Sequence, residues 1–356
     1  MKKILIILIF TVSVNLFGQA TRKYSNEFLN IGVDAAALGM GNAVTAFSAD
    51  VNSGYWNPAG LVNIEDKQIA LMHASYFANI ANYDYIAFAM PLDEKSAVGL
   101  SLIRFGVDDI IDTRALIDAG GNITPYADLP RFSAADYALT FSYSRRLPIP
   151  GFNYGINAKV VRRIIGDFAS SWGFGLDAAI QFENKKNWKF GIMARDITTT
   201  FNAWAIEDDV FDDIENEDIP EQEVPETTEL TIPKLQIGVA KKFIYRHDFS
   251  ILTELDLNVR FEENNDLIST SVASINPAFG FEVGYVDMIY LRGGVGNFQM
   301  EEQLDQSEKL GFQPSFGVGF KYKGIQIDYA FTDIGDQSIA LYSNVFSLKM
   351  DLSIFR

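Results

Sequence analysis

Side chains that often carry chemistry are scarce in this chain. It has two histidines, His73 and His247, and no cysteine. A cysteine nucleophile, a zinc ribbon and a disulfide framework are therefore excluded. The two histidines fall near the ends of different predicted strands, which leaves little material for a histidine triad or a two-histidine metal site. We predict no catalytic residue, no metal site and no cofactor.

The strongest charge pattern is an acidic run between Glu207 and Glu229. It holds twelve carboxylates, and neither lysine nor arginine occurs between Arg195 and Lys234. One interpretation is a solvated loop that self-repulsion keeps extended. The other is a partner-binding loop, with these candidate residues: Asp208, Asp209, Asp212, Asp213, Glu215, Glu217 and Asp218. The run lacks the alternating aspartates and central glycine of a calcium-binding loop.

The composition narrows the class of protein further. The chain has 356 residues, a formal net charge of −17, 48% hydrophobic residues, and 28 Phe, 15 Tyr and 4 Trp. An acidic chain lacks the broad basic footprint of a nucleic-acid-binding protein, so we expect no nucleic-acid partner. The aromatic content is high for an acidic soluble protein and indicates a membrane or other apolar surroundings.

The N-terminus indicates export. Lys2 and Lys3 precede an apolar run over residues 4–17, and Gly18 and Ala20 supply the small residues of a cleavage site. This pattern predicts a signal peptide over residues 1–20. A membrane anchor is the alternative, but the run is shorter than the ~20 residues that a helical span needs.

From about residue 68 the hydrophobic pattern has a period of two. In residues 171–182, Trp172, Phe174, Leu176 and Ile180 share one face, while Gly173, Gly175 and Asp177 share the other. Successive side chains of a strand point to opposite faces. Aromatic residues at both ends of the apolar face are typical of the two lipid–water interfaces around a transmembrane β-barrel.

The length of the segments separates a barrel from a soluble β-sandwich. They run about 10 to 15 residues, whereas soluble strands average about 5–6 and tilted spanning strands need about 9–11. The pattern predicts an all-β fold, a transmembrane antiparallel β-barrel over residues 67–356 with about 14 strands. The predicted strands are 68–77, 82–91, 95–106, 133–146, 152–165, 170–182, 187–197, 231–243, 247–262, 274–285, 288–298, 310–322, 325–333 and 341–355.

The predicted connections fall into two sets. Those after even-numbered strands are short, whereas those after odd-numbered strands include 106–131, 197–231, 262–273 and 299–309. Short periplasmic turns and long outer loops are the pattern of outer-membrane barrels. We therefore expect an outer-membrane location, with membrane lipid as a partner.

Residues 21–66 do not alternate. Their glycines and the Asn57-Pro58 pair favour a compact, turn-rich segment. A 14-stranded barrel lies between eight-stranded barrels filled by side chains and the 16–18-stranded porins with water channels. We therefore expect residues 21–66 to form a hatch in the lumen, with Tyr55 and Trp56 packed inside it; a ligand-stacking role for this pair is the alternative.

Two motifs in this segment resemble a known family. They are Gly39-Met40-Gly41-Asn42-Ala43 and Tyr55-Trp56-Asn57-Pro58-Ala59-Gly60-Leu61. Together with Asp50 they look like the N-terminal signature of the PorV/PorQ family of Bacteroidota, which is related to the FadL fatty-acid transporters. The similarity covers about residues 24–66. It implies a FadL-like barrel in which the hatch motif is Gly39, Gly41, Trp56, Asn57, Pro58, Ala59 and Gly60; a purely structural turn is the alternative.

The resemblance also implies a function. PorV-like proteins are outer-membrane components of type IX protein secretion that bind the C-terminal domains of secreted proteins and hand them on, with other secretion components as partners. A FadL-type channel for hydrophobic small molecules is the alternative, and it requires an apolar pocket beside the hatch and a break in the barrel wall. The inward faces in residues 254–260 and 317–321 are small or charged, which favours the secretion role. We expect no enzyme.

Overall fold

The computed structural model describes residues 25–76, 80–116, 123–206, 228–246, 248–302, 307–332 and 343–355. The predicted signal peptide and the acidic residues 208–218 lie outside these ranges, as does His247. Across the described ranges, no helix combines the length and the apolar character that a membrane crossing requires.

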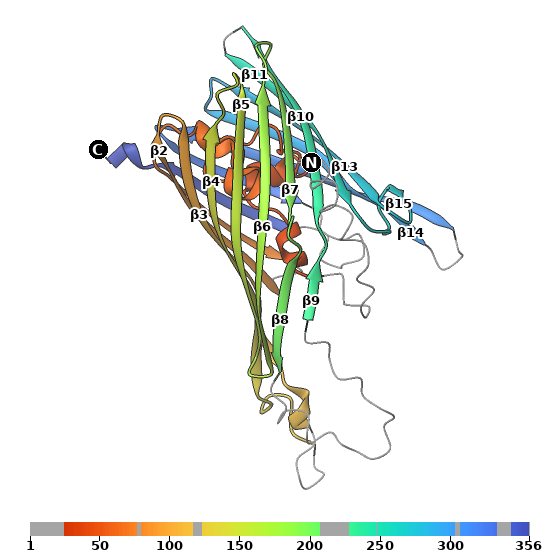
Figure 1. Ribbon diagram of the computed structural model, residues 1–356. Helices are drawn as coiled ribbons and strands as arrows, with labels where there is room; N and C mark the ends of the chain where they lie inside the picture. Colours follow the sequence, from red (N-terminus) through yellow and green to blue (C-terminus); the bar gives the residue numbers. More distant parts are fainter. Residues whose placement is uncertain are drawn as a thin grey trace, which may run out of the picture.

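The strands form one closed antiparallel ring (Figure 1). β7 and β8 together form one wall strand, as do β9 and β10, so that the ring has 14 members, as predicted; β12 is a two-residue strand in a connection. The strands are β1 Gln68–Tyr76, β2 Ala81–Asp93, β3 Ser96–Ile111, β4 Arg131–Arg146, β5 Phe152–Ile165, β6 Ala169–Glu183, β7 Trp188–Arg195, β8 Thr200–Ile206, β9 Thr228–Thr231, β10 Lys234–Tyr245, β11 Phe249–Arg260, β12 Ile268–Ser269, β13 Ser274–Tyr285, β14 Ile289–Glu302, β15 Glu308–Tyr322, β16 Ile325–Thr332 and β17 Ser343–Asp351.

The first and last strands close the barrel. β1 pairs with β2 on one side and with β17 on the other, and His73 lies opposite Asp84 and Phe346. Because each strand has two neighbours, the sheet has no open edge, and its backbone polar groups are paired within the wall.

The alternation of side chains follows the predicted register. Trp172, Phe174 and Leu176 are 53%, 63% and 44% exposed on the outer surface of β6, whereas Asp177 is buried in the lumen. The predicted lipid-facing set is confirmed. An apolar outer face and a polar inner face are the pattern that lipid imposes on a barrel wall.

The connections also follow the predicted asymmetry. The long ones join β3 to β4, β8 to β9, β11 to β13 and β16 to β17, and all of these follow odd-numbered members of the ring; the predicted long connection 299–309 is shortened because β14 reaches Glu302 and β15 begins at Glu308. Several strands are longer than predicted: β3 reaches Ile111 and β8 reaches Ile206. The extension of β3 pairs with β4, and β8 pairs with β6. Both lie beyond the apolar band, where polar residues interrupt the hydrophobic alternation.

The last strand is shorter than predicted. β17 ends at Asp351, and Leu352–Phe355 form a 3₁₀ helix instead of continuing to residue 355. The reason is the partner strand: Asp351 lies opposite Gln68, the first residue of β1, so the ladder has nothing further to pair with.

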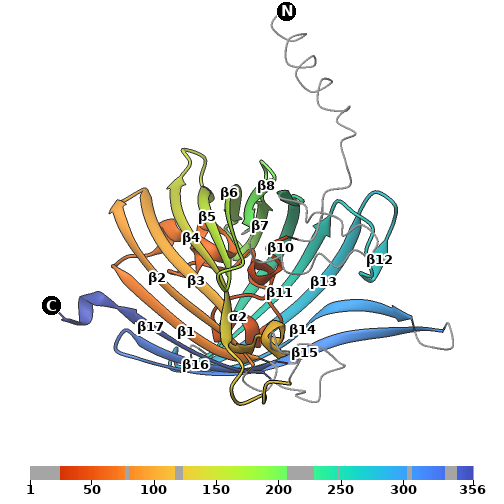
Figure 2. The same ribbon diagram turned by 90° about the horizontal axis from the view of Figure 1, so that it is seen from below.

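Residues 25–66 lie inside the ring, where Figure 2 shows their short helices surrounded by strands. The helices are η1 Glu27–Asn30, α2 Ala35–Gly39, α3 Ser53–Trp56 and η2 Pro58–Asn63. α2 packs against β15 and β16, and η2 packs against β4 and β5. The main buried apolar cluster joins this N-terminal segment to inward-facing residues of β1 and β2.

Candidate functional site

The turn at Asn57 fixes the two halves of the N-terminal segment to each other. The Asn57 side-chain oxygen accepts from the Ala59 N–H at 3.1 Å, and its amide donates to the Thr45 carbonyl at 2.9 Å. Asn57 thus caps η2, and Pro58 occupies the first turn, where the missing N–H costs no hydrogen bond. All three residues of the motif that follow, Pro58, Ala59 and Gly60, are buried.

Two glycines of the motif permit close backbone approaches. A Cβ atom on Gly60 would lie 2.1 Å from the Ser48 carbonyl oxygen. Gly41 has a φ of +66°, and a Cβ there would lie 2.8 Å from the backbone nitrogen of Val295 on β14. Only glycine fits either position without a shift of backbone. Gly39 likewise lies against the backbone of Gly317 on β15.

Tyr55 and Trp56 are buried at the centre of the segment. The Trp56 Nε1–H donates to the Val33 carbonyl at 3.0 Å, and the Tyr55 hydroxyl donates to the Leu29 carbonyl at 2.6 Å. Burial raises the pKa of the Tyr55 hydroxyl above its ordinary value, and the Arg195 guanidinium acts in the opposite direction. Both rings have polar partners within the protein, which supports the packing interpretation of this pair.

Carboxylates of the wall hold the middle of the segment. Asp256 on β11 accepts from the backbone N–H groups of Val44 and Thr45 at 3.1 and 3.0 Å, and Glu254 accepts from Ala46. The sequence pattern predicted that both acids lie on the inward face of their strand, but it did not predict which groups they bind. The available signal was the occurrence of two acids on one face of a strand whose other face is apolar.

Asp34 anchors the start of α2 to β17. Its side chain accepts from the Ala36 N–H at 3.3 Å and from the Ser347 hydroxyl at 2.8 Å. Burial raises the pKa of the Asp34 carboxyl, whereas the Lys349 ammonium acts to lower it. Lys349 also forms an ion pair with Asp50, so this end of the lumen is held by charged contacts.

The N-terminal segment separates two cavities. The outer cavity, of about 360 Å³, opens toward the rim with the long loops, and its floor includes Tyr55 and Trp56. Amide side chains dominate its wall, namely Gln236, Asn258, Asn276, Asn297, Gln299 and Gln313. The inner cavity, of about 310 Å³, is lined by charged residues of the opposite rim, among them Asp34, Glu282, Arg292 and Lys349. Apolar side chains contribute to both linings, among them Leu38 in the outer cavity and Phe47 in the inner one.

The wall is interrupted beside the outer cavity. The pairing of β6 with β7 ends at Ala178 and Ala194, and its pairing with β8 begins at Phe174 and Phe201. Residues 196–199 bridge the gap, and the Asp196 N–H donates to the Asp177 carboxylate at 2.9 Å. One backbone hydrogen bond, from the Ile197 N–H to the Leu176 carbonyl at 2.9 Å, also crosses the gap, so the break is spanned by both backbone and side-chain contacts.

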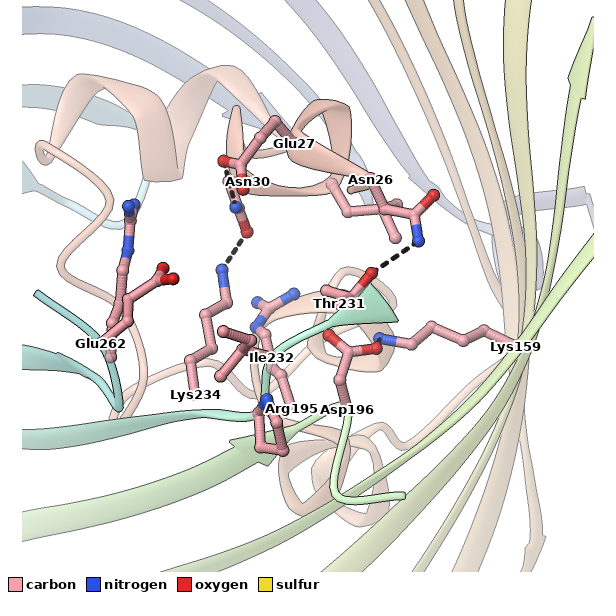
Figure 3. A pocket seen from close by; sticks show the side chains of 13 residues that line it. Asn26, Glu27, Asn30, Lys159, Arg195, Asp196, Thr231, Ile232, Lys234 and Glu262 are labelled. Carbon is pink, nitrogen blue, oxygen red and sulfur yellow. Dashed lines mark hydrogen bonds and ion pairs between the residues drawn. The ribbon is translucent and has the colours of Figure 1, made fainter. Parts of the chain in front are cut away.

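The small pocket at the break is polar (Figure 3). Lys159 lies buried between Asp196 and Asp177, at 2.7 and 2.8 Å. Lys234 bonds to Asn30, and Asn26 donates to Thr231 at 2.8 Å. The break thus joins charged and amide groups of the wall to the first turn of the N-terminal segment.

The structure brings the predicted motif residues together but separates the histidine from them. Gly39, Gly41 and residues 56–60 all lie within the segment inside the barrel. His73 lies on the outer wall, 2.7 Å from Asp84, with its side chain 58% exposed. Within the described ranges, His, Asp and Glu residues form no cluster suited to a metal ion.

Comparison with known proteins identifies both the family and the fold. The family model described as type IX secretion system protein PorV matches residues 19–257, more than half of the chain. A comparison with curated proteins gives no match. The family match agrees with the resemblance seen in the N-terminal motifs.

Solved structures of FadL-like barrels resemble this one. The Pseudomonas putida toluene transporter TodX has a TM-score of 0.55 and 11% identity, with 90% of this chain and 99% of that chain covered. The Ralstonia pickettii toluene transporter TbuX has a TM-score of 0.52 and 11% identity over 90% and 98% of the two chains. A Pseudomonas aeruginosa FadL homologue has a TM-score of 0.50 and 12% identity over 90% and 98%. At such identities the likeness establishes the fold alone.

Proposed function

Because the chain belongs to the PorV family of type IX secretion system proteins, we propose that it binds secreted proteins at the cell surface and hands them on. The protein is an outer-membrane β-barrel, and the family places it in type IX secretion. In this role the protein binds the C-terminal domains of secreted proteins as ligands, and its partners are other components of the secretion system.

The observation that supports this proposal most is the polar character of the space outside the N-terminal segment. A pocket that carries hydrocarbons is lined mainly by apolar and aromatic side chains. Here the outer cavity has a mixed lining: amides and Arg195, Lys234 and Arg260 lie beside a smaller apolar set that includes Leu38 and Trp56. Such walls suit peptide groups and charged side chains better than a hydrocarbon.

A FadL-type channel requires a break in the barrel wall and an apolar pocket beside the hatch. The interrupted wall between β7 and β8 supplies the first of these. The break lies beside the N-terminal segment, but the adjoining pocket contains the buried Lys159 ion pairs. A hydrophobic molecule that passed there would displace charged groups without replacing their contacts, which is costly. The break therefore favours the secretion role over the channel.

The N-terminal segment acts in this proposal as a hatch, with Gly39, Gly41 and residues 56–60 as its structural motif. Its buried contacts with β11, β14 and β17 support a fixed position in the lumen. We propose residues 1–20 as the signal peptide and the acidic residues 208–218 as a partner-binding loop. The role is non-enzymatic, in keeping with the family and with the exposed, isolated position of His73.

Copurification from native membranes tests the proposal. The tagged full-length protein is isolated under mild detergent, and bound proteins and lipids are identified separately. We expect secreted proteins that retain their C-terminal domains, and we expect the same proteins cut before that domain to be absent. Recovery of fatty acids or hydrocarbons instead, together with reduced uptake of such compounds in the deletion strain, would favour the channel.

A further inference from the structure

Three cations that line the outer cavity have no carboxylate partner. Among the described residues, no carboxylate oxygen lies within 4.0 Å of a side-chain nitrogen of Arg195, Lys234 or Arg260. Arg195 is buried, and the other two are half-buried. A half-buried charge without a counter-ion is costly because water screens it only in part.

Four other cations inside the same barrel form ion pairs. Lys159 pairs with two aspartates, Arg163 with Asp136 and Glu229, Arg292 with Glu282 and Asp328, and Lys349 with Asp50. The wall therefore supplies carboxylates readily, in a chain whose net charge is −17. Among the described residues of the inner cavity, Lys242 and Lys321 also form no ion pair. What sets the outer cavity apart is that three such cations, two of them arginines, lie together there.

The hydrogen-bond acceptors of Arg195 and Lys234 are neutral groups, which leaves both charges available. Arg195 donates to the Gln236 side chain at 2.7 Å and to the Tyr55 carbonyl at 2.9 Å. Lys234 donates to Asn30, as Figure 3 shows, and Arg260 lines the same cavity. Among the described residues, acids are near but form no ion pair with these cations: Glu27 lines the cavity and accepts from Asn30 at 2.7 Å, and Asp196 and Glu262 line the adjoining small pocket. The neutral acceptors orient the cations without cancelling their charge.

From this arrangement we infer that the outer cavity binds the terminal carboxylate of a polypeptide that enters from the outer rim. The inference rests on the proposed function, because a secreted protein would bring that terminus. Guanidinium groups bind carboxylates through paired hydrogen bonds, and the amides of the wall match the donors and acceptors of a peptide backbone.

The size of the cavity limits the ligand to a terminal segment. About 360 Å³ is near the lower end of ligand pockets and cannot admit a folded domain. The buried Tyr55 and Trp56 close the inner end, so the chain must stop there. An acidic side chain in the middle of a segment would need room for the chain to continue past it. A cavity that is closed at its cationic end therefore favours a chain terminus.

Binding of a short peptide to the full-length folded barrel tests the inference. The probe is the last eight residues of a secreted protein, prepared as the free acid and as the C-terminal amide, with inorganic phosphate as a competitor. We expect the free acid to bind at least ~10-fold more tightly than the amide. Arg260→Gln is expected to remove that difference while the barrel stays folded, because the backbone pairing of residue 260 with β10 and β13 does not need the arginine side chain. Lys309→Gln, which removes an exposed charge near the outer rim, is the matched control and should bind as the wild type does.

Other outcomes separate the two proposals. Equal binding of acid and amide, or equal loss in Arg260→Gln and Lys309→Gln, overturns the inference. Phosphate that competes at the same concentration as the free acid also overturns it, since the cavity would then bind anions in general. If the whole C-terminal domain binds equally well with and without its last residues, the inference fails and the proposed function stands. If no secreted domain binds but the free acid still depends on Arg260, the proposed function fails and the carboxylate site stands.

Discussion

The substitution Asn57→Ala should release the N-terminal segment from its turn. Asn57 is fully buried; its side-chain oxygen accepts from the Ala59 N–H, and its amide donates to the Thr45 carbonyl and, at 3.5 Å, to the Ile180 carbonyl. Alanine cannot make these bonds, so the buried Ala59 N–H loses its acceptor and the buried Thr45 carbonyl loses its shortest donor. The Thr45 carbonyl keeps only the Gln181 amide, at 3.5 Å.

The expected cost follows from these two orphaned groups. A buried polar group left without a partner costs about 1–3 kcal/mol, and the retained contact reduces the loss at Thr45. We therefore expect the opening free energy of the segment to fall by about 2–4 kcal/mol. A change of this size raises the population of the opened segment by a factor of about 30 to about 1,000.

Limited proteolysis of the intact folded barrel measures that population. When reclosing is faster than cleavage, the rate of cleavage follows the equilibrium population of the open form. Cuts within residues 25–66 should therefore accelerate by that factor, while heat resistance of the barrel is retained. Asn63→Ala is the matched control, because Asn63 lies in the same 3₁₀ helix with its side chain exposed. Equal cleavage of the two variants would refute the role assigned to the Asn57 turn.

Three further outcomes are expected. Leu176→Arg, at a lipid-facing position of β6, should lower the free energy of unfolding by about 2–4 kcal/mol. Spin labels at positions 175 and 176 check the register, and equal lipid exposure at the two positions would rule it out. Lys159→Met should lower the free energy of unfolding in denaturant by about 3–5 kcal/mol, because it leaves two buried carboxylates uncompensated; a loss as small as that of Lys309→Met would contradict this. Deletion of residues 208–226 should leave barrel assembly and heat resistance intact, impair release or attachment of at least one secreted protein in a salt-dependent manner, and leave fatty-acid uptake unchanged. Normal secretion in that deletion strain would argue against a partner-binding loop.

The segment inside the barrel was predictable in kind but not in its contacts. The loss of alternation over residues 21–66 and the size expected of a 14-stranded barrel predicted that it would occupy the lumen. The structure adds what it contacts there, for example the pairing of Asp256 with Val44 and Thr45. That these residues work as a hatch stays a prediction.

The strand boundaries illustrate the limit of the hydrophobic pattern. The pattern ended the third strand at residue 106, where the apolar face ends, but β3 continues to Ile111. Hydrogen bonds to β4 hold the extension, with a shift of register between Val107 and Ile110. Backbone pairing outside the membrane needs no apolar face, so hydrophobicity cannot report it.

The sequence by itself determined the class of the protein, the approximate strand number, the register of the lipid-facing residues and the asymmetry of the loops. All of these follow from side-chain order along single strands, because lipid favours apolar side chains at the outward positions of a spanning strand. Only the tertiary structure decided which inward charges meet. Folding of the barrel brings residues that are distant in the chain onto one lumen, where Lys349 meets Asp50 and Lys159 meets two carboxylates, whereas Arg195, Lys234 and Arg260 form no ion pair with any described residue. Electrostatic pairing depends on distance in space, and no periodicity in the chain encodes it.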